Sequence, residues 1–180
     1  MNNKNIALVG TGIMGKPIAM NLATAGHSMH IYARSKNTAD DLCKNENIQN
    51  YDSPASAAKK SDIAITMVSD SDDVRDVILG TNGLIDGLKK GATIIDMSTI
   101  SPEVTLDIAS NLRDKGINML DAPVSGGENG AINGSLSIMV GGEKKAFDQM
   151  LPIFQIIGEH ITLVGSSSAG QIAKACNQIL

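Results

Sequence analysis

The sequence lacks the features that mark several classes of protein. Its two cysteines, Cys43 and Cys176, form neither a CxxC pair nor a disulfide framework, so we expect free thiols in a reducing compartment. No stretch approaches the ~20 apolar residues of a membrane span. The apolar run after Asn5 stops at Gly10, which is too early for a signal peptide. We therefore expect a cytoplasmic protein with no membrane partner.

Basic residues are neither abundant nor clustered. The 15 Lys and Arg residues are outnumbered by 19 Asp and Glu residues, and the formal net charge is -4. This distribution gives no electrostatic footprint for nucleic acid. The length of 180 residues, with 42% hydrophobic and 19% charged residues, suits one ordinary globular domain. We expect a small-molecule partner, no nucleic acid and no bound metal.

Short apolar runs alternate along the chain with longer segments that carry helix signals. The run 63–68 alternates little between apolar and polar residues, which is typical of a strand buried on both faces of a parallel sheet. Ser53 and Ser101 each precede a proline and read as helix N-caps, while Gly26 and Gly116 supply left-handed stops. The pattern predicts a doubly wound α/β fold, with a mostly parallel sheet and helices on both faces. The predicted strands are 6–9, 29–32, 63–68, 93–95 and 117–120, with 136–140 and 161–164 extending the same sheet.

The turn after the first predicted strand carries three glycines at the GxGxxG spacing. Gly10 permits a tight turn, Gly12 lets the backbone approach a pyrophosphate, and Gly15 lets the next helix pack on the strand. Free N–H groups and the positive end of that helix then face the phosphates. We predict a Rossmann-like site for a nicotinamide dinucleotide, contacted by Gly10, Thr11, Gly12, Ile13, Met14 and Gly15.

The end of the second predicted strand should meet the adenosine ribose, where a site that prefers NAD carries Asp or Glu. This chain has Arg34 and Ser35 there instead. The planar guanidinium of Arg34 can bind a 2′-phosphate, and Ser35 offers a further donor. We predict NADP as the preferred cofactor. The alternative is that Arg34 stacks on adenine and that both NADP and NAD bind.

Three later segments are polar and rich in glycine or amides, at 96–102, 121–127 and 170–178. Ligands of doubly wound proteins bind at the carboxyl ends of the strands, where the first two of these segments are expected. Together with the glycine turn, the segments resemble the β-hydroxyacid dehydrogenase family. That family includes 3-hydroxyisobutyrate dehydrogenase, tartronate semialdehyde (2-hydroxy-3-oxopropionate) reductase and the glyoxylate/succinic semialdehyde reductases. The resemblance covers essentially the whole chain and specifies the family better than the substrate.

The resemblance implies roles for residues in each segment. It implies that Met67, Val68 and Thr99 line the nicotinamide end of the cofactor and that Lys174 is the catalytic residue. It also implies that a small-molecule carboxylate substrate is held by Ser125, Gly126 and Gly127. A serine and the backbone N–H groups of two glycines form a donor-rich pocket suited to a carboxylate. The implied reaction is hydride transfer between the nicotinamide and a short β-hydroxyacid or its semialdehyde.

The spacing around Lys174 agrees with that role. Gly170, Lys174 and Asn177 share one face of a predicted helix, where Gly170 would clear space and Asn177 would lie beside the lysine in the substrate site. Hydride arriving at a carbonyl carbon leaves negative charge on oxygen, which an ammonium group stabilises and protonates. In the reverse direction, the neutral amine would take the hydroxyl proton.

Some positions depart from the family pattern. Ser168 stands where close relatives usually have glycine, which bears on the approach to the nicotinamide. The run Val68-Ser69-Asp70 is more similar to the glyoxylate/succinic semialdehyde branch than to the 3-hydroxyisobutyrate branch. Related 6-phosphogluconate dehydrogenases generally carry histidines near the lysine, unlike Ala173 and Cys176. Imine-reducing relatives generally replace the lysine, so an imine reductase is a disfavoured alternative.

Members of the family continue from this helix into an all-helical C-terminal domain. We expect 1–165 to form the dinucleotide-binding domain and 166–180 to begin the interdomain helix, which is still apolar at Leu180. The helical domain is absent from these 180 residues, so we expect cofactor binding with little turnover, and a homo-oligomer only for the full-length enzyme. The alternative function is a dinucleotide-binding module without chemistry.

Overall fold

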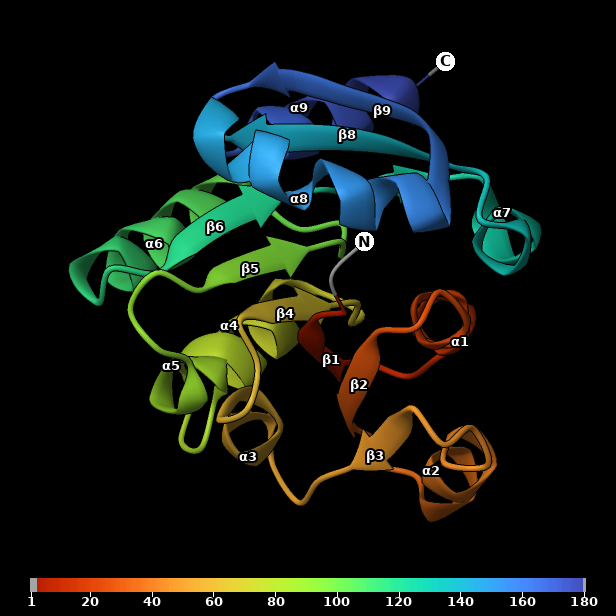
Figure 1. The fold of residues 1–180 in the computed structure, drawn as a ribbon. Coiled ribbons are helices and arrows are strands. Elements are labelled where there is room, and N and C mark those ends of the chain that lie inside the picture. The colour runs from red at the N-terminus through yellow and green to blue at the C-terminus, as the bar shows by residue number, and fades with distance from the viewer. Residues whose placement is uncertain (1–2, 180) are drawn as a thin grey trace.

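A computed structural model describes residues 3–179, in which strands and helices alternate along the chain (Figure 1). The strands are β1 (Asn5–Val9), β2 (Ser28–Tyr32), β3 (Ile48–Asn50), β4 (Ile63–Thr66), β5 (Thr93–Asp96), β6 (Asn118–Asp121), β7 (Val124–Ser125), β8 (Leu136–Gly142) and β9 (Gly158–Gly165). The helices are α1 (Gly15–Thr24), α2 (Lys36–Leu42), α3 (Pro54–Ala58), α4 (Ser71–Leu79), α5 (Leu84–Gly87), α6 (Pro102–Asp114), α7 (Gly127–Asn133), α8 (Lys144–Ile157) and α9 (Ala169–Asn177).

The strands form one sheet in the order β3-β2-β1-β4-β5-β6-β8-β7, with β9 also paired to β8. Strands β1 to β6 are mutually parallel, so their carboxyl ends lie along one edge, which we call the carboxyl edge. β8 runs antiparallel to β6 and β7, and β9 runs parallel to β8. The mostly parallel, doubly wound fold is therefore confirmed, and so is the extension of the sheet by the last two predicted strands.

The sheet divides the hydrophobic interior into two clusters. On one face, Ile18 and Leu22 of α1 and Phe154 of α8 pack against the strands. On the other face, Ile78 of α4 and Leu112 of α6 pack against them. Figure 1 shows α1 and α8 on one side of the sheet and α3 to α6 on the other. Each fully buried side chain of this size contributes roughly 1.5–3 kcal/mol of transfer free energy.

The predicted helix boundaries hold where capping residues define them. The Ser53 hydroxyl accepts a hydrogen bond from the Ser56 N–H at 3.1 Å, and the Ser101 hydroxyl accepts one from the Glu103 N–H at 3.2 Å. Gly26 and Gly116 have φ angles of 93° and 71°, so both occupy the left-handed region that favours glycine after a helix.

The structure also differs from the prediction at several elements. The sequence did not predict α2, β3, α5, α7 and β7, because each is too short to show a hydrophobic period. The expected helix from 170 to the end of the chain was wrong in its length: α9 ends at Asn177, and 178–179 form a turn. Leu180 lies outside the described residues. Within 3–179 the structure contains no helix that is both long and apolar enough to cross a membrane.

Candidate functional site

The glycine turn lies at the carboxyl edge between β1 and α1, and two of its glycines are required by close backbone packing. Gly10 has a φ of 98°, and a Cβ atom there would lie 2.1 Å from the carbonyl oxygen of Met67. A Cβ on Gly15 would lie 1.7 Å from the carbonyl oxygen of Gly10. Any side chain at either position would collide with the backbone, so both glycines hold the shape of the turn.

Gly12 differs from these two glycines because nothing lies within 4 Å of the Cβ position built on it. In residues 3–179, the N–H groups of Gly12, Ile13 and Met14 donate to no other protein group. Ile13 is 70% exposed, so the tip of the turn projects outward. An open glycine beside free N–H groups at a helix N-terminus fits the pyrophosphate of a dinucleotide.

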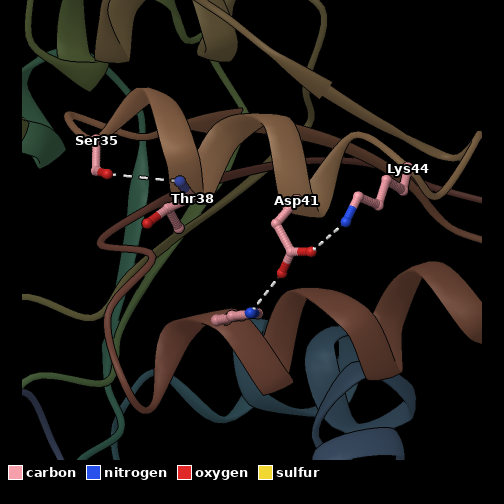
Figure 2. Close-up of polar contacts among 5 residues, drawn as sticks. Ser35, Thr38, Asp41 and Lys44 are labelled. Carbon is pink, nitrogen blue, oxygen red and sulfur yellow. Dashed lines mark hydrogen bonds and ion pairs between the residues drawn. The ribbon is translucent and has the colours of Figure 1, made fainter.

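Arg34 and Ser35 follow β2, directly beside the glycine turn, since β2 pairs with β1. The Arg34 side chain is exposed. Figure 2 shows that Ser35 caps α2, where its hydroxyl accepts a hydrogen bond from the Thr38 N–H at 3.5 Å. Ser35 therefore serves the helix with its oxygen lone pairs and retains its hydroxyl hydrogen for a ligand.

Asp41 ties α2 to α1 near this corner of the site. Its carboxylate lies 2.5 Å from the Lys16 ammonium on α1 and 2.9 Å from the Lys44 ammonium, the second contact being drawn in Figure 2. The hydrogen bond from Lys16, followed by that from Lys44, lowers the pKa of Asp41 to about 2. The helix after the glycine turn and the helix after Arg34 are thus linked by an exposed charge cluster.

The next two strand ends bring together the residues expected at the nicotinamide. The Val68 N–H, after β4, donates to the Ser98 hydroxyl, after β5, at 3.0 Å. Val68 also lies beside the glycine turn, because a Cβ added to Gly10 would be 2.9 Å from the Val68 Cγ1. Met67 and Val68 are half-buried, while Thr99 is exposed at the carboxyl edge. The structure therefore connects Val68 to both the glycine turn and the segment that carries Thr99.

The buried carboxylate of Asp96 supports the segment that carries Thr99. Asp96, which is 0% exposed, accepts hydrogen bonds at Oδ1 from the Thr66 hydroxyl at 2.8 Å and from the Ser98 N–H at 3.1 Å. Within the part of the chain that the structure describes, its Oδ2 has no hydrogen-bond partner. Burial raises the pKa of Asp96 to about 6, against the hydrogen bonds from Ser98 and Thr66, which lower it.

A second buried carboxylate, Asp121, holds the start of α9. It lies beside Asp96 on the neighbouring strand and accepts hydrogen bonds from the N–H groups of Ser168 at 2.8 Å and Gln171 at 3.1 Å. Burial raises the pKa of Asp121. Ser168 has a φ of 73°, a left-handed conformation that costs a non-glycine residue roughly 1 kcal/mol. Ser168 thus occupies a backbone conformation that glycine would adopt at lower cost.

Lys174 lies one turn further along α9 and is 7% exposed. Its ammonium donates a hydrogen bond to the Gln178 side chain at 2.9 Å. Gly170 does not clear space for a ligand as we expected, because a Cβ there would lie 2.4 Å from the carbonyl oxygen of Met139 on β8. Its role is close packing of α9 on the sheet. Asn177 is exposed at the end of the helix.

The expected carboxylate-binding residues lie at β7 and the start of α7. Ser125 is half-buried in β7, and Gly126 and Gly127 are exposed with φ angles of 125° and 59°. Gly127 is the first residue of the short helix α7. In residues 3–179, no hydrogen bond joins residues 125–127 to Lys174. The same described residues contain no group of three or more His, Cys, Asp and Glu side chains that could hold a metal ion.

Besides Asp96 and Ser98, two further residues that build the site had no predicted role. Asp121 and Gln171 both lie in segments marked as polar in the sequence, yet neither was assigned. The available signals were a carboxylate directly at a strand end, for Asp121, and an i,i+3 spacing to Lys174 on one helix face, for Gln171. Both residues are buried and act on α9 or its neighbours rather than on a ligand.

Comparison with known proteins identifies the family. The model of the NAD-binding domain of 6-phosphogluconate dehydrogenase matches residues 5–165. The chain belongs to this family. It is similar to 2-hydroxy-3-oxopropionate reductase from Escherichia coli strain K12, with 43% identity over 175 residues that cover 97% of this chain and 59% of that protein. The matched range ends before Ala173 and Cys176, the positions that we expected to differ from 6-phosphogluconate dehydrogenases.

Solved structures support the same assignment. The 3-hydroxyisobutyrate dehydrogenase of Mycobacterium tuberculosis with L-serine has a TM-score of 0.92 and 30% identity, covering 98% of this chain and 60% of that one. Psf3 in complex with NADP+ has a TM-score of 0.91 and 26% identity, covering 97% of this chain and 61% of that one. The resemblance to the β-hydroxyacid dehydrogenases is thereby confirmed. The chain spans about three fifths of the length of these relatives.

Proposed function

We propose that this chain is the cofactor-binding part of a reductase or dehydrogenase acting on a short β-hydroxyacid or its semialdehyde. The observation that carries the proposal is the placement of Lys174. The lysine is buried on α9, and the preceding turn of that helix contacts the segment bearing Thr99. A buried lysine close to the loop that carries Thr99 is better explained by a role in proton transfer than by a place on a solvated helix face.

In this proposal, Lys174 transfers the proton and the residues around the nicotinamide orient the cofactor. When bound, the nicotinamide supplies the hydride that adds to the substrate carbonyl carbon. Lys174 donates a proton to the carbonyl oxygen, so that oxygen ends as a hydroxyl and the lysine as a neutral amine. In the oxidative direction, the neutral Lys174 accepts the hydroxyl proton. Met67, Val68 and Thr99 orient the nicotinamide, and the buried strand ends beneath them exclude water.

The substrate carboxylate is assigned to Ser125, Gly126 and Gly127. The left-handed φ angles of the two glycines turn the backbone sharply at an exposed position, where N–H groups can converge on an anion. Asn177 is assigned to the same substrate as a second polar contact. The relatives named for 2-hydroxy-3-oxopropionate and 3-hydroxyisobutyrate point to substrates of this size and charge.

We assign NADP as the preferred cofactor, with NAD as the alternative. Arg34 is exposed beside the glycine turn and is free to contact a 2′-phosphate, and no Asp or Glu occupies that strand end to hold a 2′-hydroxyl. The phosphates are assigned to Gly10, Thr11, Gly12, Ile13, Met14 and Gly15.

Residues 1–165 are assigned as the dinucleotide-binding domain and 166–180 as the lead into a further domain of the full-length gene product. The relatives are longer than this chain, which supports the division. In this assignment, the further domain completes the substrate pocket and the oligomer interface. The 180 residues alone then bind cofactor but turn over substrate poorly.

The deciding experiment measures NADPH oxidation by the full-length gene product with a panel of semialdehydes, beginning with 2-hydroxy-3-oxopropionate. We expect turnover that Lys174→Ala abolishes, with NADPH affinity nearly unchanged. Lys115→Ala, which removes an exposed lysine after α6, is the matched control. Retained turnover in Lys174→Ala would refute the catalytic role. NADPH binding without turnover of any substrate would favour a dinucleotide-binding module.

A further inference from the structure

The side chain of Gln171 spans the loop that follows β5. We call residues 97–101 the β5 loop. The Gln171 Oε1 accepts a hydrogen bond from the Ile100 N–H at 3.1 Å, and its Nε2 donates one to the Ser98 carbonyl oxygen at 2.8 Å. Thr99 is the residue between those two partners. One planar amide therefore fixes the backbone on both sides of Thr99.

The β5 loop passes this connection on to the neighbouring strand end. Ser98, whose carbonyl group meets Gln171, also accepts a hydrogen bond from the Val68 N–H through its hydroxyl. Gln171 on α9 is thus joined through Ser98 to Val68, and it holds the backbone on both sides of Thr99 through Ser98 and Ile100. Val68 and Thr99 are two of the residues assigned to the nicotinamide, and Gln171 ties both to the helix that carries Lys174.

The helix itself has little freedom to move against the sheet. Asp121 accepts the Gln171 N–H, and Gly170 lies so close to β8 that a Cβ there would meet the Met139 carbonyl oxygen at 2.4 Å. Lys174 is three residues after Gln171 and therefore on the same helix face. Because α9 is held on the sheet and the Gln171 amide is bonded to the β5 loop, the distance between Lys174 and that loop is fixed.

Helix capping does not account for the Gln171 side chain. The N-terminal end of α9 is already capped by Asp121, so the side chain of Gln171 is not needed to close the helix. Burying an amide to 2% exposure is unfavourable unless both of its polar groups are paired. Here both are paired, and both partners belong to the β5 loop.

We propose that Gln171 is a positioning residue that sets the placement of the nicotinamide relative to Lys174. The proposal rests on the proposed function, in which Lys174 transfers the proton. Hydride and proton must reach the two ends of one carbonyl group, so the loop that orients the nicotinamide and the helix that carries the lysine need a defined separation. Gln171 is the side chain that links them.

The test compares Gln171→Met with Gln155→Met in the full-length gene product, with NADPH and 2-hydroxy-3-oxopropionate as probes. Methionine keeps the volume of glutamine and removes both hydrogen bonds, while Gln155 is an exposed residue on α8. Under conditions where urea unfolding shows both variants folded, we expect kcat to fall at least about tenfold in Gln171→Met only. The isotope effect with cofactor deuterated at nicotinamide C4 should rise, because hydride transfer becomes slower.

Gln171→Glu provides a readout that a structural role would not move. A protonated glutamate has the same acceptor and donor pattern as glutamine, whereas the carboxylate turns an acceptor toward the Ser98 carbonyl oxygen. Turnover relative to wild type should therefore recover as the pH falls from about 8 to about 6, since burial raises the pKa of a carboxyl group. Should Gln171→Met be recovered unfolded, this variant gives the decisive comparison, and a wild-type pH profile would count against the proposal.

A third measurement needs no turnover. In the 180-residue chain, NADPH should slow amide hydrogen exchange in α9, and Gln171→Met should remove that response while NADPH still binds. Wild-type kcat and isotope effect in Gln171→Met, with Lys174→Ala inactive, would overturn the positioning role and leave the proposed function standing. Turnover retained in Lys174→Ala would instead overturn the proposed function itself.

Discussion

The carboxylate of Asp121 accepts a hydrogen bond from the backbone N–H of Ser168, 47 residues away in the sequence, at 2.8 Å. This contact joins the carboxyl end of β6 to the left-handed residue that precedes α9. A second bond, from the Gln171 N–H to the other carboxylate oxygen, completes the cap. The position of the Lys174 helix therefore depends on one buried carboxylate at a strand end.

Asp121→Asn should lower the free energy of unfolding by about 1–2 kcal/mol. Asparagine keeps one oxygen, but its NH₂ group would face a backbone N–H where the carboxylate now accepts. Urea unfolding at neutral pH measures the change. Asp70→Asn is the matched control, since the exposed Asp70 caps α4 through the Asp73 N–H and asparagine caps helices equally well. Equal effects at both positions would contradict the special role of Asp121.

The buried carboxyl group of Asp96 should make the protein less stable as the pH rises from about 4 to about 6. Its pKa is raised from 3.8 to about 6, so the native state binds more protons than the unfolded state in that window. At about 1.36 kcal/mol per pKa unit, the loss is at most about 3 kcal/mol.

Asp96→Asn should flatten this pH dependence, which urea unfolding at several pH values between about 4 and about 7 would record. Part of the slope should remain, because burial also raises the pKa of Asp121. Asp114→Asn, at an exposed position at the end of α6, should keep the wild-type slope. An unchanged slope in Asp96→Asn would show that the pKa of this carboxyl group is not raised in the folded protein.

Alanine substitutions at Gly15 and Gly12 should affect different properties, the first stability and the second cofactor binding. Gly15→Ala should destabilise the protein by at least about 3 kcal/mol, because its Cβ would overlap the Gly10 carbonyl oxygen. Gly12→Ala should change the free energy of unfolding by less than about 0.5 kcal/mol, yet weaken NADPH binding at least ~10-fold by occupying the pyrophosphate position. Fluorescence titration with NADPH, beside urea unfolding of both variants, separates the two effects.

Arg34→Ala should weaken NADPH binding by ~10- to 100-fold and leave NADH binding almost unchanged. The 2′-phosphate is the group that distinguishes the two cofactors, and Arg34 is the exposed cation beside its expected place. Lys36→Ala serves as control, because Lys36 is exposed nearby and pairs with Asp40. Equal losses for both cofactors in Arg34→Ala would instead indicate stacking on adenine.

The sequence predicted the parts of this fold that repeat. Strands with apolar runs and helices with serine caps and glycine stops have local signals, and the structure has them where the signals lie. It did not predict β3, where only Ile48 is buried in three residues, or α2, which is mostly polar. Such elements are determined by neighbours in space rather than by their own periodicity.

The candidate site was predictable to a different depth. The glycine turn carries its function in a fixed spacing, so Gly10 and Gly15 could be assigned from their order along the chain. The role of Gly170 could not be assigned in this way. A side chain is excluded there by the backbone of Met139 on a separate strand, not by a ligand. Gln171 could be placed on the lysine face of a helix, but only the fold shows that its amide meets the β5 loop.

The reversal of direction at β8 has a consequence for how a helix can be brought to the carboxyl edge of a parallel sheet. Had β8 and β9 followed the direction of β1 to β6, the helix after β9 would run back along the sheet, away from the carboxyl edge. Because these two strands run the other way, the chain enters α9 beside Asp121 and reaches the β5 loop within the first turn of that helix. A proton donor could therefore be added to a designed dinucleotide-binding domain by reversing the direction of the last two strands, without remodelling the loops.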